Sequence, residues 1–181
     1  MGKSILITGG ARSGKSRRAQ ELATKAGGQV LFVATAEAGD DEMKRRIKAH
    51  RKTRPKDWAT IEVTTHIGRE ITKNIDRAKT VIIDCITLLI SNVLLRYDEK
   101  TDSAIVEKAV TTEIKELLDC LKHIKADFII VTNEVGLGII PGDRLSRLYR
   151  DMLGKANRML AEKVDEVYLM VAGIPVTVKK G

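Results

Sequence analysis

The sequence of 181 residues contains few cysteine, proline and aromatic residues. Its two cysteines, Cys85 and Cys120, are too few for a disulfide framework and lack the spacing of a metal site. Aromatic residues make up 3% of the chain, which leaves few side chains on which a single-stranded nucleic acid would stack. No apolar run approaches the roughly 18 residues of a membrane span, and no signal peptide pattern is present. We therefore expect a cytoplasmic protein with no membrane span and no nucleic-acid partner.

The remaining composition is that of a globular domain. Hydrophobic residues make up 43% of the chain and charged residues 31%, which excludes a disordered or fibrous protein. The length and the absence of a linker-like tract predict one domain over residues 1–181. The net charge of +8 indicates anionic partners such as nucleotides, phosphorylated metabolites or nucleic acid, and charge alone does not distinguish them.

Short apolar runs alternate with amphipathic stretches, which predicts an α/β protein with a mostly parallel sheet covered by helices. The predicted strands span residues 4–8, 30–34, 60–64, 80–84, 128–132, 166–171 and 174–178. Residues 81–83 and 128–131 are continuously apolar, so we expect their strands to be central. The last two strands read as a hairpin across Ala172-Gly173, and Pro175 predicts that the final strand is an antiparallel edge strand.

The most informative motif follows the first predicted strand and opens a predicted helix. It matches G-x-x-x-x-G-K-[ST], the P-loop, without departure. Glycines let successive backbone N–H groups approach phosphate oxygens beside a helix N-terminus. Lys15 would neutralise the β- and γ-phosphates, and the Ser16 hydroxyl would bind Mg²⁺. The alternative is a chance glycine-rich turn. The predicted nucleotide-binding residues of this motif are Gly9, Gly10, Ala11, Arg12, Ser13, Gly14, Lys15 and Ser16.

Two carboxylates follow predicted central strands, at the sheet edge where ligands of open α/β sheets bind. Asp84 is the candidate to hold Mg²⁺, directly or through water, and the alternative is that it caps the next helix at Thr87. Glu134 is a candidate to orient a water, a metal or a substrate hydroxyl. It is equally well explained as a loop carboxylate hydrogen-bonded to neighbouring backbone.

A dense run of positive charge follows the second predicted strand and favours an anionic ligand over a merely solvated helix face. Its basic residues are Lys44, Arg45, Arg46, Lys48, Arg51, Lys52, Arg54 and Lys56. His50 lies within this run and is a candidate nucleophile toward phosphorus, although packing or surface exposure also explains a lone histidine. Further along, Glu62 would accept hydrogen bonds from guanine N1–H and N2–H₂, or would face solvent on a strand.

Several short pieces of sequence, taken in order, resemble one enzyme family from nearly end to end. They are Thr8-Gly9-Gly10-Ala11-Arg12-Ser13-Gly14-Lys15-Ser16, Ala34-Thr35, Asp40-Asp41-Glu42-Met43, Arg46-Ile47, His50, Arg54-Pro55, Trp58, Asp84-Cys85-Ile86-Thr87, Thr132-Asn133-Glu134-Val135-Gly136, Arg147, Arg150-Asp151 and Asp165-Glu166-Val167. The chain is similar to the bifunctional adenosylcobinamide kinase / adenosylcobinamide-phosphate guanylyltransferases of cobalamin biosynthesis. One departure is Gly142-Asp143, where Glu-Asn or a similar pair is expected, so a role for Asp143 is left open.

The resemblance implies a RecA-like P-loop fold, a homotrimer and two reactions. In the first, a nucleoside triphosphate, ATP or GTP, phosphorylates the aminopropanol hydroxyl of adenosylcobinamide. In the second, GMP passes from GTP through a guanylylated histidine to adenosylcobinamide phosphate, with loss of pyrophosphate. The resemblance makes His50 that histidine. The residues that it implies for nucleotide binding, besides the P-loop, are Thr35, Arg51, Lys52, Thr53, Arg54, Glu62 and Asp84.

Two other functions are compatible with the same residues. One is a simple P-loop kinase of small molecules in which His50 only packs or contacts phosphate. The other is a nucleic-acid-dependent ATPase that uses the basic segment as its groove, against which the scarcity of aromatic residues argues.

Overall fold

The computed structural model describes residues 2–37, 45, 51 and 54–181. His50, Lys52 and Thr53, three of the predicted site residues, therefore lie outside the described residues. The elements in chain order are β1 (Ser4–Gly9), α1 (Lys15–Ala26), β2 (Val30–Ala34), β3 (Ala59–Glu62), α3 (Ile67–Asn74), β4 (Thr80–Asp84), α4 (Ile86–Leu94), α5 (Ser103–His123), β5 (Asp127–Val131), α6 (Arg144–Lys163), β6 (Glu166–Val171) and β7 (Ile174–Lys179).

The strands form one seven-stranded sheet of order β3-β2-β4-β5-β1-β6-β7. All neighbouring strands run parallel except β6 and β7, which pair antiparallel. The predicted α/β class, the central position of β4 and β5, and the antiparallel edge strand β7 are confirmed. Since β5 separates β1 from β4, the P-loop strand and the Asp84 strand flank a common neighbour, and their carboxyl ends reach the same edge of the sheet.

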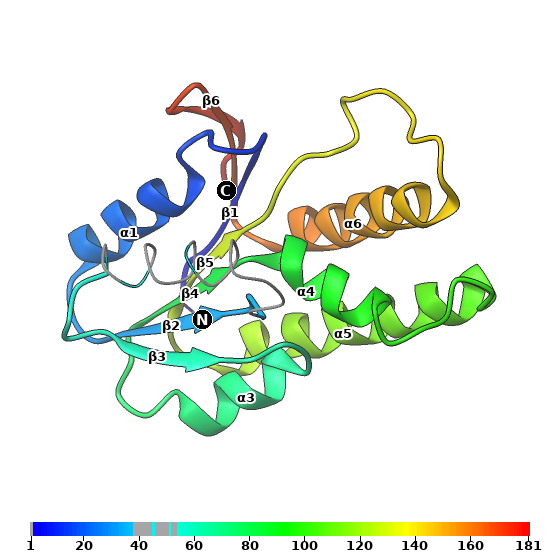
Figure 1. Ribbon diagram of the computed structural model, residues 1–181. Helices are drawn as coiled ribbons and strands as arrows, with labels where there is room; N and C mark the ends of the chain where they lie inside the picture. Colours follow the sequence, from blue (N-terminus) through cyan, green and yellow to red (C-terminus); the bar gives the residue numbers. More distant parts are fainter. Residues whose placement is uncertain (1, 38–44, 46–50, 52–53) are drawn as a thin grey trace.

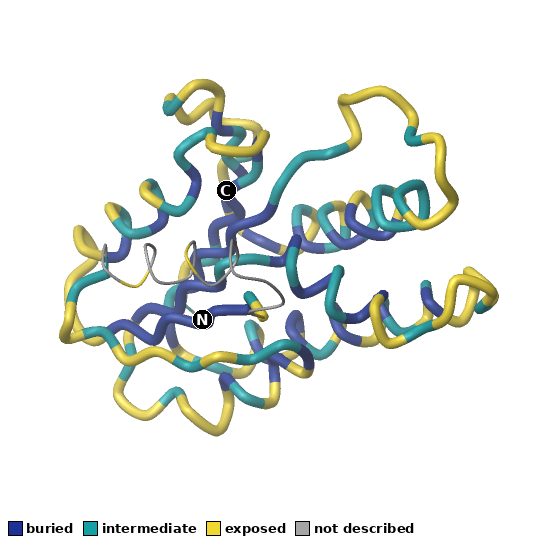
Figure 2. Tube along the Cα trace, in the orientation of Figure 1, coloured by how far each residue is buried: buried dark blue, intermediate teal, exposed yellow. Residues whose placement is uncertain are grey.

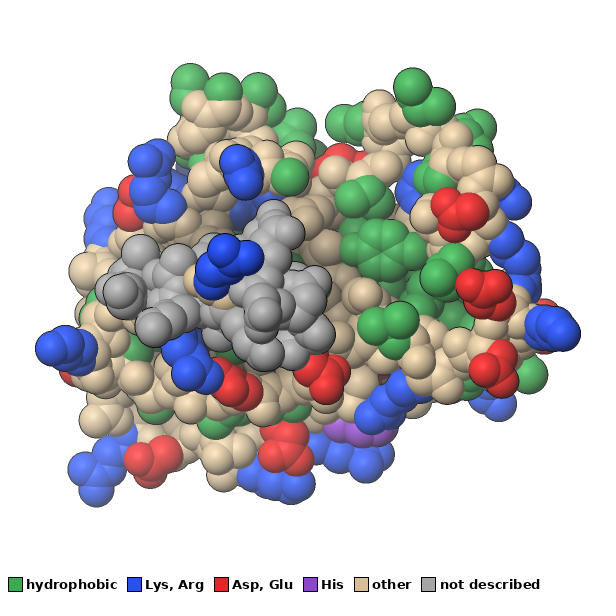
Figure 3. Space-filling model, in the orientation of Figure 1, with side chains coloured by type: hydrophobic (Ala, Val, Ile, Leu, Met, Phe, Trp, Pro, Cys, Tyr) green, Lys and Arg blue, Asp and Glu red, His purple; other side chains and the backbone are tan. Residues whose placement is uncertain are grey.

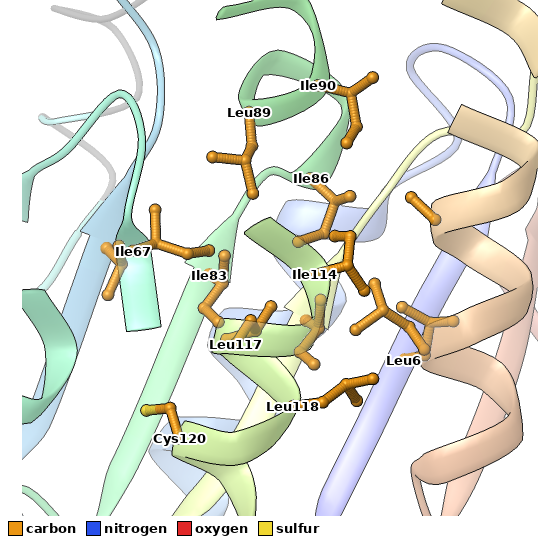
Figure 4. Packing of buried hydrophobic residues seen from close by; sticks show 14 of the residues in the cluster. Leu6, Ile67, Ile83, Ile86, Leu89, Ile90, Ile114, Leu117, Leu118 and Cys120 are labelled. Carbon is orange, nitrogen blue, oxygen red and sulfur yellow. The ribbon is translucent and has the colours of Figure 1, made fainter. Parts of the chain in front are cut away.

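Alternating side chains divide the strands between two apolar layers, as the period of two of a β-strand requires. On one face, Leu6, Ile83 and Ile130 pack with α3, α4, α5 and α6. In Figure 4, Ile83 lies with Ile86, Ile114 and Leu117 in this layer.

The opposite face carries a smaller apolar layer. There Ile7, Phe32 and Ile129 pack with Ala19 and Ala23 of α1. Figure 1 shows α1 on one side of the sheet and α3, α4, α5 and α6 on the other, and Figure 2 shows that the most continuously buried segments are the strands between them. Among the described residues, four helices therefore pack on one face of the sheet and α1 packs on the other.

Most predicted strands agree with the structure to within one residue, but the third is wrong at its end. The predicted strand at residues 60–64 is observed as Ala59–Glu62. The main-chain N–H of Val63 still donates to Ala34 O at 2.9 Å, after which the chain turns toward α3. Among the described residues, no helix has the length and apolar character needed to cross a membrane.

Candidate nucleotide-binding site

The P-loop has a backbone shape that requires glycine at two positions. Gly9 has φ 142°, and a Cβ there would lie 2.5 Å from the carbonyl oxygen of Met170 on β6. Gly14 has φ 91° and precedes the first residue of α1 as its N-cap. Side chains are strained at such positive φ values, and the contact at Gly9 also leaves no space for one. The sequence motif therefore corresponds to a tight loop whose end is the N-terminus of α1.

Lys15 lies folded back over this loop. Its Nζ donates to Gly10 O at 2.6 Å and lies 3.5 Å from Ser13 Oγ. The residue is 8% exposed, and burial lowers the pKa of its ammonium group from the ordinary value, although the neighbouring Cys85 and Asp84 oppose this shift. A buried ammonium with neutral oxygen partners favours an anionic ligand, which would restore the charge compensation lost with water.

A cleft of 530 Å³ runs from the P-loop across the carboxyl ends of β2, β3, β4 and β5. Its lining residues are Ala11, Arg12, Ser13, Gly14, Lys15, Ser16, Arg17, Ala34, Ala36, Arg54, Glu62, Asp84, Cys85, Thr87, Leu88, Val131 and Asn133. The volume lies in the range of small-molecule pockets. Most of the described residues that the sequence predicted for nucleotide binding therefore come together around one space.

Asp84 is the last residue of β4 and faces this cleft together with Ser16. The next helix, α4, begins at Ile86, and its N-cap is Cys85, so the alternative in which Asp84 caps that helix is wrong. A hydroxyl and a carboxylate are oxygen donors of the kind that Mg²⁺ accepts when nucleotide phosphates and water supply the rest.

Thr35 is fully buried beside the end of β4. Its hydroxyl donates to Cys85 O at 2.7 Å and accepts from the Cys85 N–H at 2.8 Å. Its own N–H donates to Asp84 O at 3.2 Å, and its carbonyl accepts from the Asn92 amide at 2.9 Å. The structure thus gives Thr35 a positioning role: it fixes the main chain that carries Asp84. Direct contact between Thr35 and a nucleotide stays a prediction.

Arg54 and Glu62 form the outer wall of the cleft. The guanidinium carbon of Arg54 lies 3.7 Å from the ring centroid of Phe32, a cation–π contact. Among the described residues, Nη1 of Arg54 is buried without a hydrogen-bond partner, and burial lowers the pKa of this guanidinium. Arginine stays charged in proteins, so this unpaired donor at the cleft suits a phosphate.

Glu62 is half-exposed, and its Oε1 pairs with Nη2 of Arg51. This ion pair holds Arg51, which the sequence predicts for phosphate binding, beside a residue that lines the cleft. A guanine that binds to Glu62 would therefore compete with Arg51.

The carboxyl end of β5 presents Asn133 to the cleft rather than Glu134. The Oε1 atom of Glu134 accepts from the Gly136 N–H, which supports its interpretation as a loop carboxylate bonded to neighbouring backbone. The N–H of Asn133 donates to Thr87 Oγ1 at 2.7 Å, and its carbonyl accepts from the Asn157 amide at 3.0 Å. Asn133 is not among the site residues predicted from the sequence, although its place directly after an apolar strand was an available signal.

Asp143 has a structural role, and the two cysteines form no disulfide. Asp143 is the N-cap of α6, where its Oδ1 accepts from the Ser146 N–H at 2.7 Å, a bond that lowers the pKa of this carboxyl. Cys85 and Cys120 are both free, as expected. Burial raises the pKa of each thiol to about 11, so neither is a thiolate at neutral pH.

Comparison with known proteins adds an independent observation. The family model described as "Cobinamide kinase / cobinamide phosphate guanyltransferase" matches residues 5–178. Two relatives are named bifunctional adenosylcobalamin biosynthesis protein CobU. The Escherichia coli (strain K12) protein is 41% identical and the Salmonella typhimurium (strain LT2) protein 42% identical, each over 180 residues, which cover 97% of this chain and 99% of the relative. A third, bifunctional adenosylcobalamin biosynthesis protein CobP of Pseudomonas aeruginosa (strain PAO1), is 40% identical over 174 residues and 96% of each chain.

A solved structure from Pyrococcus horikoshii OT3 is similar in shape, with a TM-score of 0.58 over 98% of this chain and 86% of that chain. Its sequence identity is 9%, so the likeness concerns the fold alone. Together with the family match, it supports the predicted P-loop architecture, a mostly parallel sheet with an antiparallel C-terminal strand.

Proposed function

The chain belongs to the cobinamide kinase / cobinamide phosphate guanyltransferase family, and on that premise we propose that it phosphorylates adenosylcobinamide and then joins the product to GMP taken from GTP. Membership makes the protein a kinase and a nucleotidyltransferase of cobalamin biosynthesis. The observation that carries the finer proposal is the single cleft that collects the P-loop, Asp84, Arg54 and Glu62.

In the phosphorylation step, the P-loop N–H groups and Lys15 hold the β- and γ-phosphates of the donor nucleotide. The charge of Lys15 then offsets the negative charge on the transferring phosphoryl group and on the leaving diphosphate. The aminopropanol oxygen forms a bond to the γ-phosphorus, the bond from that phosphorus to the β-phosphate oxygen breaks, and the hydroxyl proton leaves to solvent or a base.

Ser16 and Asp84 would hold Mg²⁺ in this cleft. One hydroxyl and one carboxylate are enough for this ion, because Mg²⁺ takes much of its coordination from phosphates and water. When bound, Mg²⁺ neutralises phosphate charge during transfer.

In the nucleotidyl transfer step, the His50 imidazole attacks the α-phosphorus of GTP. A P–N bond forms, the bond to the β-phosphate oxygen breaks, and pyrophosphate leaves. An oxygen of cobinamide phosphate then attacks the same phosphorus and the P–N bond breaks, which divides one difficult transfer into two. Arg51, Lys52, Thr53 and Arg54 would bind the nucleotide phosphates. Arg54 Nη1, which has no partner among the described residues, and the pairing of Arg51 with Glu62 support this placement beside the cleft.

Glu62 would select guanine, because a carboxylate accepts from both N1–H and N2–H₂ and adenine lacks that pair of donors. The carboxylate would exchange Arg51 for the base when GTP binds, which would release Arg51 toward the phosphates. The homotrimer, the cytoplasmic location and the preferred phosphoryl donor stay predictions.

The test is to incubate the protein with Mg²⁺ and GTP and to search by mass spectrometry for a GMP adduct on the peptide that contains His50. The adduct is expected to be labile in acid and stable in base, as a phosphoramidate is. His50→Ala is expected to abolish the adduct while cobinamide phosphorylation continues, and His123→Ala serves as the control. A His50→Ala protein that still transfers GMP would overturn the guanylylated His50 intermediate, and a wild-type protein that phosphorylates cobinamide without GMP transfer would be a simple P-loop kinase.

A further inference from the structure

A second concave surface lies beside the nucleotide cleft, between the C-terminal part of α4 and the N-terminal part of α6. Two adjoining hollows of 240 and 360 Å³ share Leu94 and Leu145. The smaller one is lined by Ser91, Leu94, Leu95, Leu145, Ser146 and Tyr149. We call this surface the α4–α6 groove. Figure 3 shows hydrophobic side chains gathered on this part of the face.

The groove has an unusual exposure of large apolar side chains. Leu95 is 75% exposed and Leu145 is 42% exposed. Outside the two hollows, the segment between β5 and α6, which arches above α6 in Figure 1, also exposes Leu137, Ile139 and Ile140. Apolar patches of this kind mark binding surfaces when polar residues surround them. Here Asp98, Lys100 and Arg144 stand along the larger hollow and supply such polar groups.

The groove is continuous with the nucleotide cleft along one helix. Leu88 lines the cleft, while Ser91 and Leu95 line the groove, and their helical spacing places all three on one face of α4. The rise of 1.5 Å per residue separates Leu88 from Leu95 by about 10 Å along that helix. Tyr149 from α6 lies beside this path and donates its hydroxyl to Thr87 O at 3.3 Å. A ligand in the groove would therefore reach the phosphate site through a short flexible arm.

We propose that the α4–α6 groove binds the corrin ring of cobinamide, with the aminopropanol arm directed along α4 toward the nucleotide cleft. This assignment rests on the proposed function. The corrin ring is a wide, methyl-bearing macrocycle surrounded by amide side chains, so it requires an apolar surface with a polar rim. The nucleotide cleft is occupied by the triphosphate when phosphoryl transfer occurs, so the ring must lie outside it while the hydroxyl enters.

The contacts divide between the two parts of the ligand. Leu95, Leu145 and Tyr149, which line the smaller hollow, would pack against the ring. Amide side chains of the ring would exchange hydrogen bonds with the polar residues of the larger hollow. Asn133, whose main chain is held from both sides at the cleft wall, lies where the arm would enter.

The experiment compares Leu95→Asp with the control Val178→Asp. Val178 is 63% exposed on β7, and Lys179 pairs with Val167 near the start of β6, so Val178 lies at the end of the sheet away from the cleft. Cobinamide binding is measured by equilibrium dialysis from its visible absorbance, and GTP binding is measured in parallel with a fluorescent GTP analogue. Leu95→Asp is expected to weaken cobinamide binding by at least about 10-fold, because a charge would face the apolar ring. GTP binding by both variants is expected to stay within about twofold of wild type.

A second variant, Ser91→Trp, fills the groove without adding charge and is expected to weaken cobinamide binding similarly. Wild-type cobinamide affinity in both Leu95→Asp and Ser91→Trp overturns the assignment. A second copy of the chain could also occupy the groove, and sedimentation velocity of the same variants tests this. An altered oligomeric state with unchanged cobinamide affinity would assign the groove to contact between copies of the chain. A wild-type protein that binds GTP but no cobinamide would overturn the proposed function itself.

Discussion

The two walls of the nucleotide cleft are built in different ways. The P-loop wall comes from consecutive residues whose backbone does most of the binding, and its shape is set by local conformation at Gly9 and Gly14. The opposite wall is assembled from side chains at the ends of separate elements, such as Glu62, Asp84 and Asn133. We call the P-loop side the local wall, and a sequence motif predicts it. We call the opposite side the assembled wall, and it depends on strand order and on the groups that hold each strand end in place.

The largest expected effect is on the local wall. Lys15→Met removes the buried charge that would offset the phosphates while keeping a side chain of similar length. Loss of one such group at a transferring phosphate is expected to lower the rate of cobinamide phosphorylation by about 10²–10³-fold. Steady-state kinetics with ATP and with GTP would measure this loss. Lys25→Met, in the last turn of the same helix, is the control. A loss below about threefold would contradict the role given to Lys15.

Arg54→Leu tests the assembled wall. It removes a charged donor whose Nη1 is buried without a partner among the described residues, and it keeps an apolar contact with Phe32. A charge-assisted hydrogen bond contributes about 1.5–3 kcal/mol, so the Kd for GTP is expected to rise by about 10- to 100-fold. Calorimetric titration with GTP measures it.

Arg158→Leu is the control for this change, since Arg158 is an exposed arginine whose side chain pairs with Glu162 on α6. Arg54→Lys is expected to recover only part of the affinity, because lysine lacks the planar fork that stacks on the ring. Unchanged GTP affinity in Arg54→Leu would remove Arg54 from the nucleotide site.

Thr35→Val tests whether the assembled wall needs the hydrogen bonds between the Thr35 hydroxyl and the main chain of Cys85. Valine has nearly the same shape, but it leaves the N–H and C=O of Cys85 without the bonds made by the threonine hydroxyl. The free energy of unfolding is expected to fall by about 1–3 kcal/mol. Urea unfolding measures this change, with Thr112→Val, at an exposed position of α5, as the control. A kcat for phosphorylation that falls while the KM for the nucleotide stays constant would separate positioning of Asp84 from direct binding.

The smallest expected effect is the slow alkylation of the Cys85 thiol at neutral pH. Because burial raises the pKa of this thiol to about 11, the neutral form dominates at pH 7, and alkylation by iodoacetamide should be slow. The rate is expected to rise by about tenfold per pH unit up to that pKa, since only the thiolate reacts. Mass spectrometry of timed samples follows the modification. Rapid labelling at neutral pH would show that the wall at Cys85 is more open than the structure describes.

Particular residues explain which predictions from the sequence hold. Strands such as 30–34 and 80–84 agree with the structure because their apolar runs need burial on both faces. Glu134 and Asn133 illustrate the opposite case. They are adjacent, and the main chain of Asn133 is held at the cleft wall because its N–H donates to Thr87 Oγ1 and its carbonyl accepts from the Asn157 amide. The position after an apolar strand points to both residues and does not say which of them faces the cleft.

The N-terminus of α3, away from the site, is another feature that depends on a residue distant in the sequence. The buried carboxylate of Glu113 on α5 accepts from His66 N–H at 2.9 Å and from Ile67 N–H at 3.0 Å, so a distant residue satisfies the first donors of this helix. The local sequence before Ile67 contains no signal for that arrangement.

The sequence by itself determined the P-loop, the α/β class and the central strands, because glycine conformation and apolar periodicity act over neighbouring residues. Only the tertiary structure decided that Thr35 supports the end of β4, that Asn133 rather than Glu134 faces the cleft, and that α4 joins the cleft to a second groove. These outcomes depend on hydrogen bonds and packing between elements far apart in the chain, and their partners are fixed only when the strands take their order in the sheet.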